Sequence, residues 1–164
     1  MKATLSVVIP AYNEEENIAK CLTSISMVLK KLKLDAEIIV VNDGSTDKTG
    51  NIAKKFTKSL PNLKIVTNRP NKGYGGSLKA GFTASSKEFI VMIPADNQFD
   101  FNQVQDLLSK QAETNADIVS GIRVKDSDPK YRQFLRWGWN TLVRAIFGYL
   151  ATDIDCGFKL IRRS

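Results

Sequence analysis

Short apolar runs alternate along the chain with longer segments in which apolar residues recur every three or four positions. Runs of this length, bounded by turn residues, indicate strands buried on both faces of a parallel sheet. The longer segments have the spacing of amphipathic helices. The alternation predicts an α/β fold, a mostly parallel sheet with helices on both faces. The strands are expected within residues 5–10, 37–41, 63–67, 89–93, 117–122 and 153–161.

The helices are predicted between these strands. The first is expected to begin with Asn13 as its N-cap, Glu16 completing a capping box and an acidic first turn that suits the helix dipole. No internal repeat or linker interrupts the pattern, so residues 1–164 are expected to form one domain. The helices are expected to end near residues 34, 59 and 85, to pass through 104–108, and to cover 131–150.

The composition narrows the classes of function. The chain has no histidine, which excludes Ser–His and Cys–His catalysis and a His-ligated zinc site within it. Cys21 and Cys156 lack CxxC spacing and are expected to be buried apolar residues. No apolar run reaches the roughly 18 residues of a membrane span, and the N-terminus lacks an apolar signal-peptide core. A cytoplasmic location is therefore expected.

The net charge of +7 is distributed unevenly. Residues 1–120 contain 15 Lys and Arg against 13 Asp and Glu, whereas residues 121–164 contain 9 against 4. A basic C-terminal segment favours an anionic partner, which can be a phosphorylated substrate, a membrane surface or nucleic acid, although a solvated basic face has the same composition. No nucleic-acid recognition motif accompanies the charge, so nucleic acid is not expected as a partner.

The helix predicted over residues 131–150 mixes aromatic and aliphatic side chains with Arg132, Arg136 and Arg144. Such a helix fits the interface of a membrane. It fits equally well in a protein core, with its arginines on the solvent side. The sequence leaves both interpretations open.

The strand predicted at 89–93 is followed by polar residues. Pro94 ends the strand, because it has no backbone N–H to donate. Asp96 and Gln98 are then left at the carboxyl end of the strand, the edge at which open α/β sheets bind ligands. Carboxylate and amide oxygens suit a hard cation such as Mg²⁺ or Mn²⁺. A simple polar turn is the alternative interpretation.

Other strand ends carry further candidate residues. Tyr12 follows the first strand, where an aromatic ring can stack on a base. Asp43 follows the second strand and can hold a ribose or base edge, or form an Asx turn that caps a helix. The glycine-rich stretch 71–77 can bring backbone N–H groups and Lys72 close to phosphates. It matches neither Walker A nor GxGxxG, so an ordinary turn before a helix explains it as well.

The candidate residues at the strand ends belong to a set of six short motifs that follow one another along the chain. With them the chain resembles a family 2 glycosyltransferase of the GT-A fold, and is most similar to the dolichol-phosphate mannosyltransferase and polyprenyl-phosphate glycosyltransferase branch. The motifs are Val-Val-Ile-Pro-Ala-Tyr-Asn-Glu at 7–14, Val-Asn-Asp-Gly-Ser-Thr-Asp at 41–47, Asn-Lys-Gly at 71–73, Ala-Asp-Asn-Gln at 95–98, Gly-Ile-Arg at 121–123 and Asp-Ile-Asp-Cys-Gly-Phe-Lys at 153–159.

The resemblance implies an inverting transfer of a hexose from a nucleotide-diphosphate sugar, of the GDP-mannose or UDP-glucose type, to a polyprenyl phosphate. It implies that the nucleoside is held by Pro10, Tyr12, Glu14, Val41 and Asp43. It places Lys72 and Gly73 near the diphosphate. It assigns the Mg²⁺ or Mn²⁺ site and the diphosphate to Ala95, Asp96 and Gln98. It implies that Arg123 and Arg132 contact the phosphates of donor or acceptor. It also implies that Asp96 and Arg123 are the catalytic residues.

Two features depart from the family pattern. The usual Asp-x-Asp is replaced by Pro94-Ala95-Asp96, so one acidic group of the metal site is missing. Family members normally continue past the Gly-Phe-Lys stretch, often into membrane helices. The resemblance therefore implies a catalytic domain trimmed at its C-terminus that works at the cytoplasmic face of a membrane.

Two alternative functions stay open. The acceptor can instead be a hydroxyl group in cell-envelope polysaccharide synthesis, with Asp153 or Asp155 as the base. The chain can also be a nucleotide-binding module without turnover. A phosphate acceptor needs no base, since a phosphate monoester with a second pKa of about 6 is already anionic at neutral pH. The absence of histidine favours that acceptor.

Overall fold

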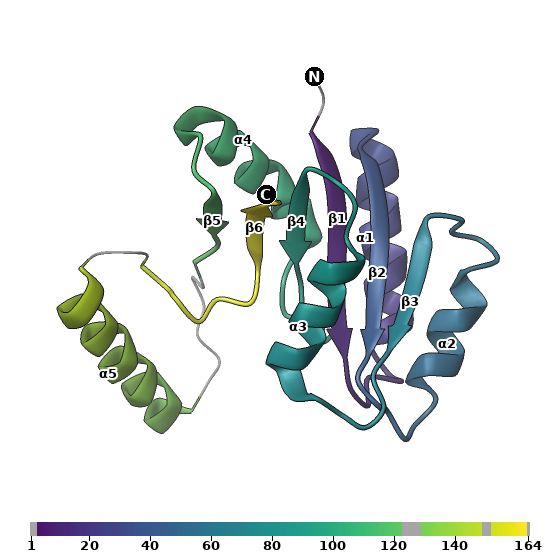
Figure 1. The fold of residues 1–164 in the computed structure, drawn as a ribbon, viewed down its shortest axis with the longest axis horizontal. Helices are drawn as coiled ribbons and strands as arrows, with labels where there is room; N and C mark the ends of the chain where they lie inside the picture. Colours follow the sequence, from purple (N-terminus) through teal and green to yellow (C-terminus); the bar gives the residue numbers. More distant parts are fainter. Residues whose placement is uncertain (1–2, 123–128, 149–151, 164) are drawn as a thin grey trace.

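The computed structural model describes residues 3–122, 129–148 and 152–163 (Figure 1). Strands and helices alternate through most of this length, as the apolar pattern predicts. The strands are β1 (Thr4–Ala11), β2 (Asp35–Asn42), β3 (Leu63–Thr67), β4 (Phe89–Met92), β5 (Ile118–Ser120) and β6 (Lys159–Arg162). The helices are α1 (Ile18–Leu32), α2 (Thr49–Phe56), α3 (Gly73–Ala84), the short 3₁₀ helix η1 (Phe101–Gln103), α4 (Val104–Thr114) and α5 (Lys130–Phe147).

The six strands form one sheet in the order β3-β2-β1-β4-β6-β5. Strands β1 to β4 are parallel to one another, and β6 runs antiparallel to both β4 and β5. The prediction of a mostly parallel sheet is therefore confirmed. The carboxyl ends of β1 to β4 meet at one edge, the lower edge in Figure 1, and β6 begins at that edge because it runs in the opposite direction.

Helices cover both faces of the sheet. On one face α1, α2 and α4 enclose the larger core, in which Val7 and Ile9 of β1 contact apolar side chains such as Leu22 of α1. On the other face α3 packs alone over a smaller cluster that includes Val8 and Val41. Since successive residues of a strand point to opposite faces, each buried strand supplies both cores.

Helix α3 lies unusually close to the sheet at Gly81. A Cβ atom at this position would lie 2.3 Å from Cγ1 of Val8 and 3.2 Å from Cγ2 of Val41. The absence of a side chain at Gly81 therefore sets the depth at which α3 rests on β1 and β2.

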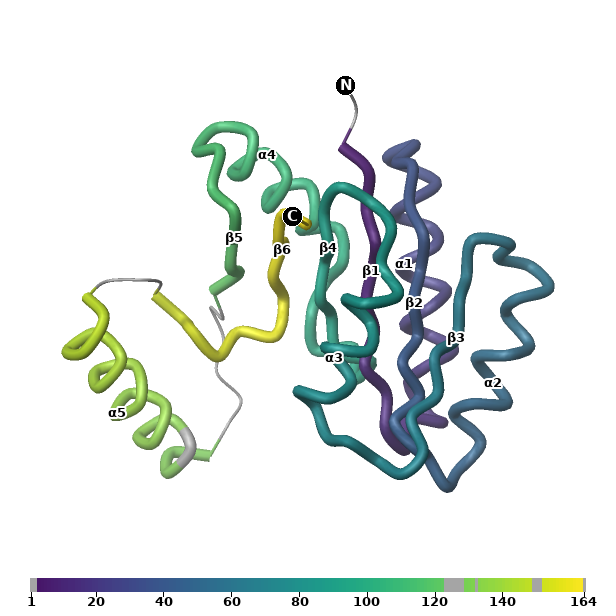
Figure 2. Tube along the Cα trace, in the orientation of Figure 1, coloured from purple at the N-terminus to yellow at the C-terminus, as the bar shows by residue number. Residues whose placement is uncertain are grey.

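Helix α5 stands apart from both layers, beyond β5, as the ribbon and the Cα trace show (Figures 1 and 2). Asn140 Oδ1 accepts a hydrogen bond from the backbone N–H of Ile154 at 3.2 Å, which ties the helix to the segment before β6. Among its described side chains only Val143 is both apolar and buried, so α5 contributes little to the core formed by the described residues. The exposed apolar side chains are Tyr131, Phe134, Leu135, Trp137, Trp139, Leu142, Ile146 and Phe147, each at least 51% exposed.

Helix α1 begins later than predicted. Its N-cap is Asn17, not Asn13, and its first turn contains no acidic residue. Asn13 has a left-handed backbone (φ 55°), and its side chain binds a different turn. The capping box predicted for Asn13 and Glu16 is therefore wrong, because the Asn13 side chain accepts a hydrogen bond from the backbone N–H of Thr46, 33 residues away.

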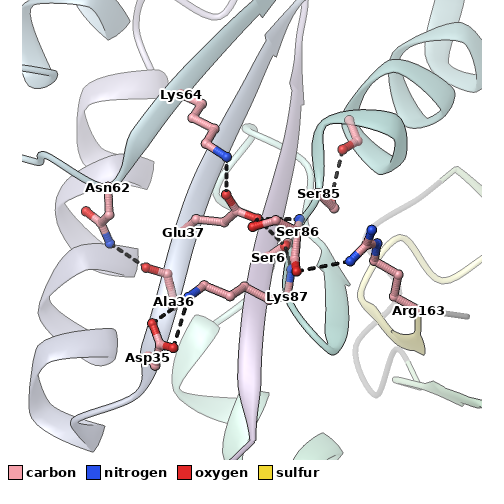
Figure 3. A network of polar contacts seen from close by, with 11 residues as sticks. Ser6, Asp35, Ala36, Glu37, Asn62, Lys64, Ser85, Ser86, Lys87 and Arg163 are labelled. Atoms are coloured by element: carbon pink, nitrogen blue, oxygen red, sulfur yellow. Dashed lines mark hydrogen bonds and ion pairs between the residues drawn. The ribbon is translucent and has the colours of Figure 1, made fainter.

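At the amino edge of the sheet, buried Glu37 joins four segments (Figure 3). Its Oε1 accepts hydrogen bonds from Ser6 Oγ at 2.7 Å and from the backbone N–H and Oγ of Ser86 at 2.6 and 2.8 Å. Its Oε2 lies 2.6 Å from Nζ of Lys64. Burial raises the pKa of Glu37, but these bonds outweigh it and lower the pKa from 4.5 to about 2.

Candidate functional site

The turns that follow β1 and β2 are hydrogen-bonded to each other. The backbone N–H of Thr46 donates to Asn13 Oδ1 at 2.9 Å, and that of Glu14 donates to Thr49 Oγ1 at 2.8 Å. Asp47 accepts from the backbone N–H of Glu15 at 3.0 Å and from Thr49 Oγ1 at 2.6 Å. The two strand ends are thereby fixed side by side, and Asp47 serves as a structural link between the turns.

Asp43 lies immediately beyond β2 and is only 3% exposed. Its Oδ1 accepts hydrogen bonds from Asn68 Nδ2 at 2.7 Å and from the backbone N–H of Lys72 at 3.0 Å. Burial raises the pKa of Asp43, but the bonds from Asn68 and Lys72, together with the nearby Ser77 hydroxyl and Gly73 N–H, outweigh it and lower the pKa. Asp43 is therefore an ionised carboxylate at neutral pH, an acceptor of hydrogen bonds only.

A cavity of about 420 Å³ opens beside Asp43 at the carboxyl edge of the sheet. Its volume lies within the range of small-molecule sites. Larger hollows run along the outer face of α1 and beside the start of β2, away from the carboxyl ends of the strands. The cavity is lined by Pro10, Ala11, Tyr12, Glu14, Asp43, Asn71, Gly73, Tyr74, Ser77, Pro94 and Ala95.

Tyr12 and Asp43 thus share one cavity although they follow different strands, the geometry that the sequence predicts. The Tyr12 side chain is 50% exposed, so one part of its ring surface is open to a ligand. Pro10, Glu14, Gly73 and Ala95 line the same space. Their contacts with a ligand stay predictions.

The first turn of α3 forms a wall of the cavity. Gly73 and Ser77 lie four residues apart, on one side of the helix, and Tyr74 joins them. The pKa of Tyr74 is raised by burial and by the nearby carboxylate of Asp96 and side chain of Cys156. The sequence left this stretch open between a phosphate loop and an ordinary turn before a helix, and neither interpretation singled out Asn71, Tyr74 or Ser77 as lining a cavity. The signal for Ser77 in the sequence was its spacing of four residues from Gly73, which places both residues on one side of a helix.

Asp96 is partly buried in the turn after β4, beside the cavity. Its Oδ1 accepts a hydrogen bond from the backbone N–H of Gln98 at 3.0 Å. Burial, Asp96 and Glu14 together raise the pKa of the Cys21 thiol to about 12, so both carboxylates lie near that buried residue. Across residues 3–122, 129–148 and 152–163, no three Cys, Asp or Glu side chains cluster closely enough to hold a metal by themselves.

The segment between α5 and β6 returns to the same edge, since Lys159 at the start of β6 pairs with Met92 at the end of β4. Lys159 Nζ donates to the carbonyl oxygens of Ile154, at 2.9 Å, and Cys156. A Cβ atom at Gly157 would lie 2.9 Å from Cγ of Pro94. Pro94, which replaces an acidic residue of the family motif, is therefore a packing surface for this segment.

The structure does not bring every predicted residue to the cavity. The Val41 side chain is fully buried beneath α3, because its position in β2 points to that face, so only its backbone is available to a ligand. Lys72 contributes its backbone N–H to Asp43, and Gln98 is exposed. Arg123 and the side chain of Arg132 lie outside the described residues.

Of the two alternative bases, Asp153 is buried and Asp155 is exposed. Both lie in the segment that Lys159 fastens to the carboxyl edge. The position of this segment follows from the reversed direction of β6.

Two relatives are similar to this chain over almost all of its length. The dolichyl-phosphate beta-glucosyltransferase of Dictyostelium discoideum is 34% identical over 176 residues, which cover 97% of this chain and 54% of that protein. The undecaprenyl-phosphate 4-deoxy-4-formamido-L-arabinose transferase of Pseudomonas fluorescens is 30% identical over 162 residues, which cover 98% and 47%. The chain therefore spans about half the length of these relatives.

The fold is similar to that of a mannosyltransferase from Pyrobaculum calidifontis, determined in complex with GDP-Man and Mn²⁺. The TM-score is 0.74 at 19% identity, covering 99% of this chain and 45% of the other. At that identity the likeness shows the fold alone, which confirms the predicted GT-A architecture. The family model described as glycosyl transferase family 2 matches residues 6–164. The chain therefore belongs to glycosyl transferase family 2.

Proposed function

We propose that this chain is the catalytic part of an inverting glycosyltransferase that moves a hexose from a nucleotide-diphosphate sugar to a polyprenyl phosphate. The observation that carries the proposal is the convergence of Tyr12 and Asp43 on one cavity at the carboxyl edge of the sheet, with Asp96 close to Tyr74 of its lining. The dolichyl-phosphate and undecaprenyl-phosphate transferases that this chain resembles support the choice of acceptor.

The cavity would receive the nucleoside of the donor, of the GDP-mannose or UDP-glucose type. The exposed Tyr12 ring can stack on the base, and the ionised Asp43 can accept a hydrogen bond from it. Lys72 and Gly73, at the start of α3, would lie near the diphosphate, where a helix N-terminus favours anions. GDP-Man in the structural relative supports this class of donor.

The residues present fit a divalent cation only in company with the substrate. Of the two carboxylates between β4 and η1, Asp100 caps η1, and one oxygen of Asp96 already accepts from Gln98 N–H, so Asp96 alone is left for a metal. Mg²⁺ and Mn²⁺ keep several waters and bind substrate phosphates, so one protein carboxylate suffices when a diphosphate is present. When bound, the metal would neutralise charge on the departing diphosphate. Mn²⁺ in the structural relative supports this cofactor class.

The acceptor phosphate would attack without a general base, because it is already anionic at neutral pH. This suits a chain that has no histidine. Arg123 and Arg132 would meet the phosphates. A hydroxyl acceptor would instead need a base such as Asp153 or Asp155, which lie at the correct edge of the sheet. That acceptor is the second candidate.

Calorimetric titration of Mn²⁺ with and without nucleoside diphosphate tests the site. The wild-type chain is expected to bind Mn²⁺ weakly alone and at least roughly tenfold more tightly with UDP or GDP, a difference of about 1.4 kcal/mol. Asp96→Asn should remove this enhancement, and Pro94→Asp should strengthen the binding of metal alone. Asp106→Asn, an exposed acidic position on α4, is the matched control. Equal Mn²⁺ affinity in Asp96→Asn and wild type would show that Asp96 holds no metal.

Contact with a membrane is the final part of the proposal, because a polyprenyl phosphate is held in a bilayer. No helix in the described part of the chain combines the length and apolar character needed to cross one. Helix α5 offers exposed aromatic and aliphatic side chains together with Arg136 and Arg144, a composition that suits the interface. A peripheral contact through α5, at the cytoplasmic face, is therefore the arrangement we propose.

Binding to vesicles that contain phosphatidylserine tests this contact. Charge reversal at Arg132, Arg136 and Arg144 should weaken binding about 100-fold, since each basic residue near an anionic surface contributes about 1 kcal/mol. Charge reversal at three exposed lysines of and after α2, namely Lys54, Lys55 and Lys58, is the control of equal charge change. Equal losses in both triple variants, or no binding by the wild type, would exclude a specific role for α5.

A further inference from the structure

Ser77 has an unexplained hydroxyl group. It is 1% exposed, and across the described residues its Oγ is the one buried side-chain polar atom without a hydrogen-bond partner. Burying such a group unpaired is costly, so native proteins rarely do it. Serine and threonine in helices usually solve the problem by donating to a carbonyl one turn earlier.

The same helix shows that this solution is available. Thr83 Oγ1 donates to the carbonyl of Lys79 at 2.9 Å, and Ser85 Oγ, at the C-cap of α3, donates to that of Gly81 at 2.9 Å. Ser77 does not make the equivalent bond. It lines the cavity instead, with Asp43 and Tyr12. The hydroxyl is close enough to Asp43 to help stabilise the carboxylate, without the geometry of a hydrogen bond.

The cavity therefore presents two complementary groups side by side. Asp43 is an acceptor only, whereas the Ser77 hydroxyl has a proton to donate. Both hydrogen bonds described above for Asp43 fall on Oδ1. A ligand edge that matches this pair has an N–H group next to a carbonyl oxygen.

Among nucleobases, uracil has such an edge at its ring N3–H, between two carbonyl groups, and guanine has one at its ring N1–H beside O6. Adenine and cytosine have the reverse pattern, a ring nitrogen that accepts beside an amino group that donates. Against them, the Asp43 carboxylate would face a lone pair. Binding of the wrong base would leave the buried groups of the site without hydrogen-bond partners, and the cost of these unpaired groups lowers the affinity for that base.

We propose that Ser77 is a specificity-determining residue, which donates its hydroxyl proton to a base carbonyl while Asp43 accepts from the adjacent ring N–H. The donor is then a uracil or guanine nucleotide and not an adenine or cytosine nucleotide. This inference rests on the proposed function, because it assumes that the cavity receives the base of a nucleotide.

Calorimetric titration of UDP, GDP, ADP and CDP in the presence of Mn²⁺ provides the test. The wild-type chain should bind UDP or GDP at least roughly tenfold more tightly than ADP and CDP. Ser77→Ala should lower the affinity for the preferred nucleotide about five- to tenfold, the usual effect of one buried hydrogen bond, and change that for ADP and CDP less than about twofold. Ser85→Ala removes a hydroxyl that is already paired within α3 and should change neither.

Thio-substituted nucleotides examine the same contact without changing the protein. Sulfur accepts hydrogen bonds more weakly than a carbonyl oxygen. If UDP is the preferred nucleotide, the wild type should bind either 2-thio-UDP or 4-thio-UDP several-fold more weakly than UDP. If GDP is preferred, it should bind 6-thio-GDP several-fold more weakly than GDP. Ser77→Ala should bind the two forms equally. If the wild-type chain shows no effect of sulfur, the contact is excluded even when Ser77→Ala does not fold.

The possible failures are distinct. Binding of none of the four nucleotides by the wild type overturns the proposed function, and this inference with it. Preference for ADP or CDP overturns the base class. Tight binding of UDP or GDP with full affinity in Ser77→Ala, or with no effect of sulfur in the wild type, overturns the role of Ser77 and leaves the proposed function standing.

Discussion

Glu37 and Asp43 are two buried carboxylates at opposite ends of β2, with exposures of 5% and 3%. Hydrogen bonds outweigh burial at both and lower the pKa of each. Glu37 has both oxygens occupied, by donors from three other segments of the fold (Figure 3). Asp43 instead borders a cavity, beside a hydroxyl that has no partner. A lowered pKa therefore does not distinguish the two carboxylates, whereas unused hydrogen-bonding capacity next to a cavity does, and it is the reason why we propose a ligand-binding role for Asp43 and not for Glu37.

Asp43→Asn should have the largest effect on the functional side of this comparison. We expect the affinity for UDP or GDP to fall about 100-fold, because a charge-assisted hydrogen bond contributes about 1.5 to 3 kcal/mol and the amide can present a donor against the base N–H. Calorimetric titration measures the change. A loss smaller than about threefold would contradict the assignment of Asp43 to the nucleoside.

Glu37→Gln should affect stability and leave ligand binding alone. We expect the free energy of unfolding at pH 7 to fall by about 2 kcal/mol, since the variant leaves Lys64 without its partner and weakens the bonds to Ser6 and Ser86. Urea denaturation measures this, and nucleotide affinity should stay within about twofold. Asp35→Asn, at an exposed ion pair with Lys87, is the control and should cost less than about 0.5 kcal/mol. A drop in nucleotide affinity comparable to that of Asp43→Asn would remove the distinction between the two sites.

The stabilisation by Glu37 should depend on pH in a defined direction. Its pKa is lower in the folded state than its ordinary value of 4.5, so the stabilisation is complete above pH 4.5 and is lost as the pH falls toward about 2. By pH 3 roughly half or more of the difference between wild type and Glu37→Gln should be gone. Urea denaturation at pH 6, 4.5 and 3 follows it. A difference that is constant or grows toward low pH contradicts the ionised state of Glu37.

Lys64→Met should have a smaller effect than Glu37→Gln. The Lys64 side chain is 52% exposed, so water screens its attraction to Glu37. We expect a loss of unfolding free energy below about 1 kcal/mol, which shrinks further at high salt. Thermal or urea denaturation at two salt concentrations measures it. An effect as large as that of Glu37→Gln would mean that the ion pair, and not the bonds to Ser6 and Ser86, holds this network together.

Most of the fold could be predicted because apolar periodicity is a local signal. The strand ends also located Tyr12, Asp43 and Asp96, since parallel strands bring their carboxyl ends to one edge. The start of α1 was wrong because Asn13 has a partner, Thr46, that is distant in the sequence. The exposure of α5 could not be predicted, because the same amphipathic pattern serves a core and an interface. Ser77 was missed because an unpaired hydroxyl is visible only once its neighbours are placed.

The close seating of α3 at Gly81 has a consequence for the kinetics of binding. The helix that carries Tyr74 and Ser77 rests directly on Val8 and Val41, so this wall of the cavity is formed before any ligand arrives. Little conformational entropy is then lost on association, beyond that of exposed side chains such as Tyr12. Gly81→Ala would push the helix away from the sheet. We expect Gly81→Ala to lower the association rate constant of the nucleotide, because the displaced helix would have to change its position each time a nucleotide binds.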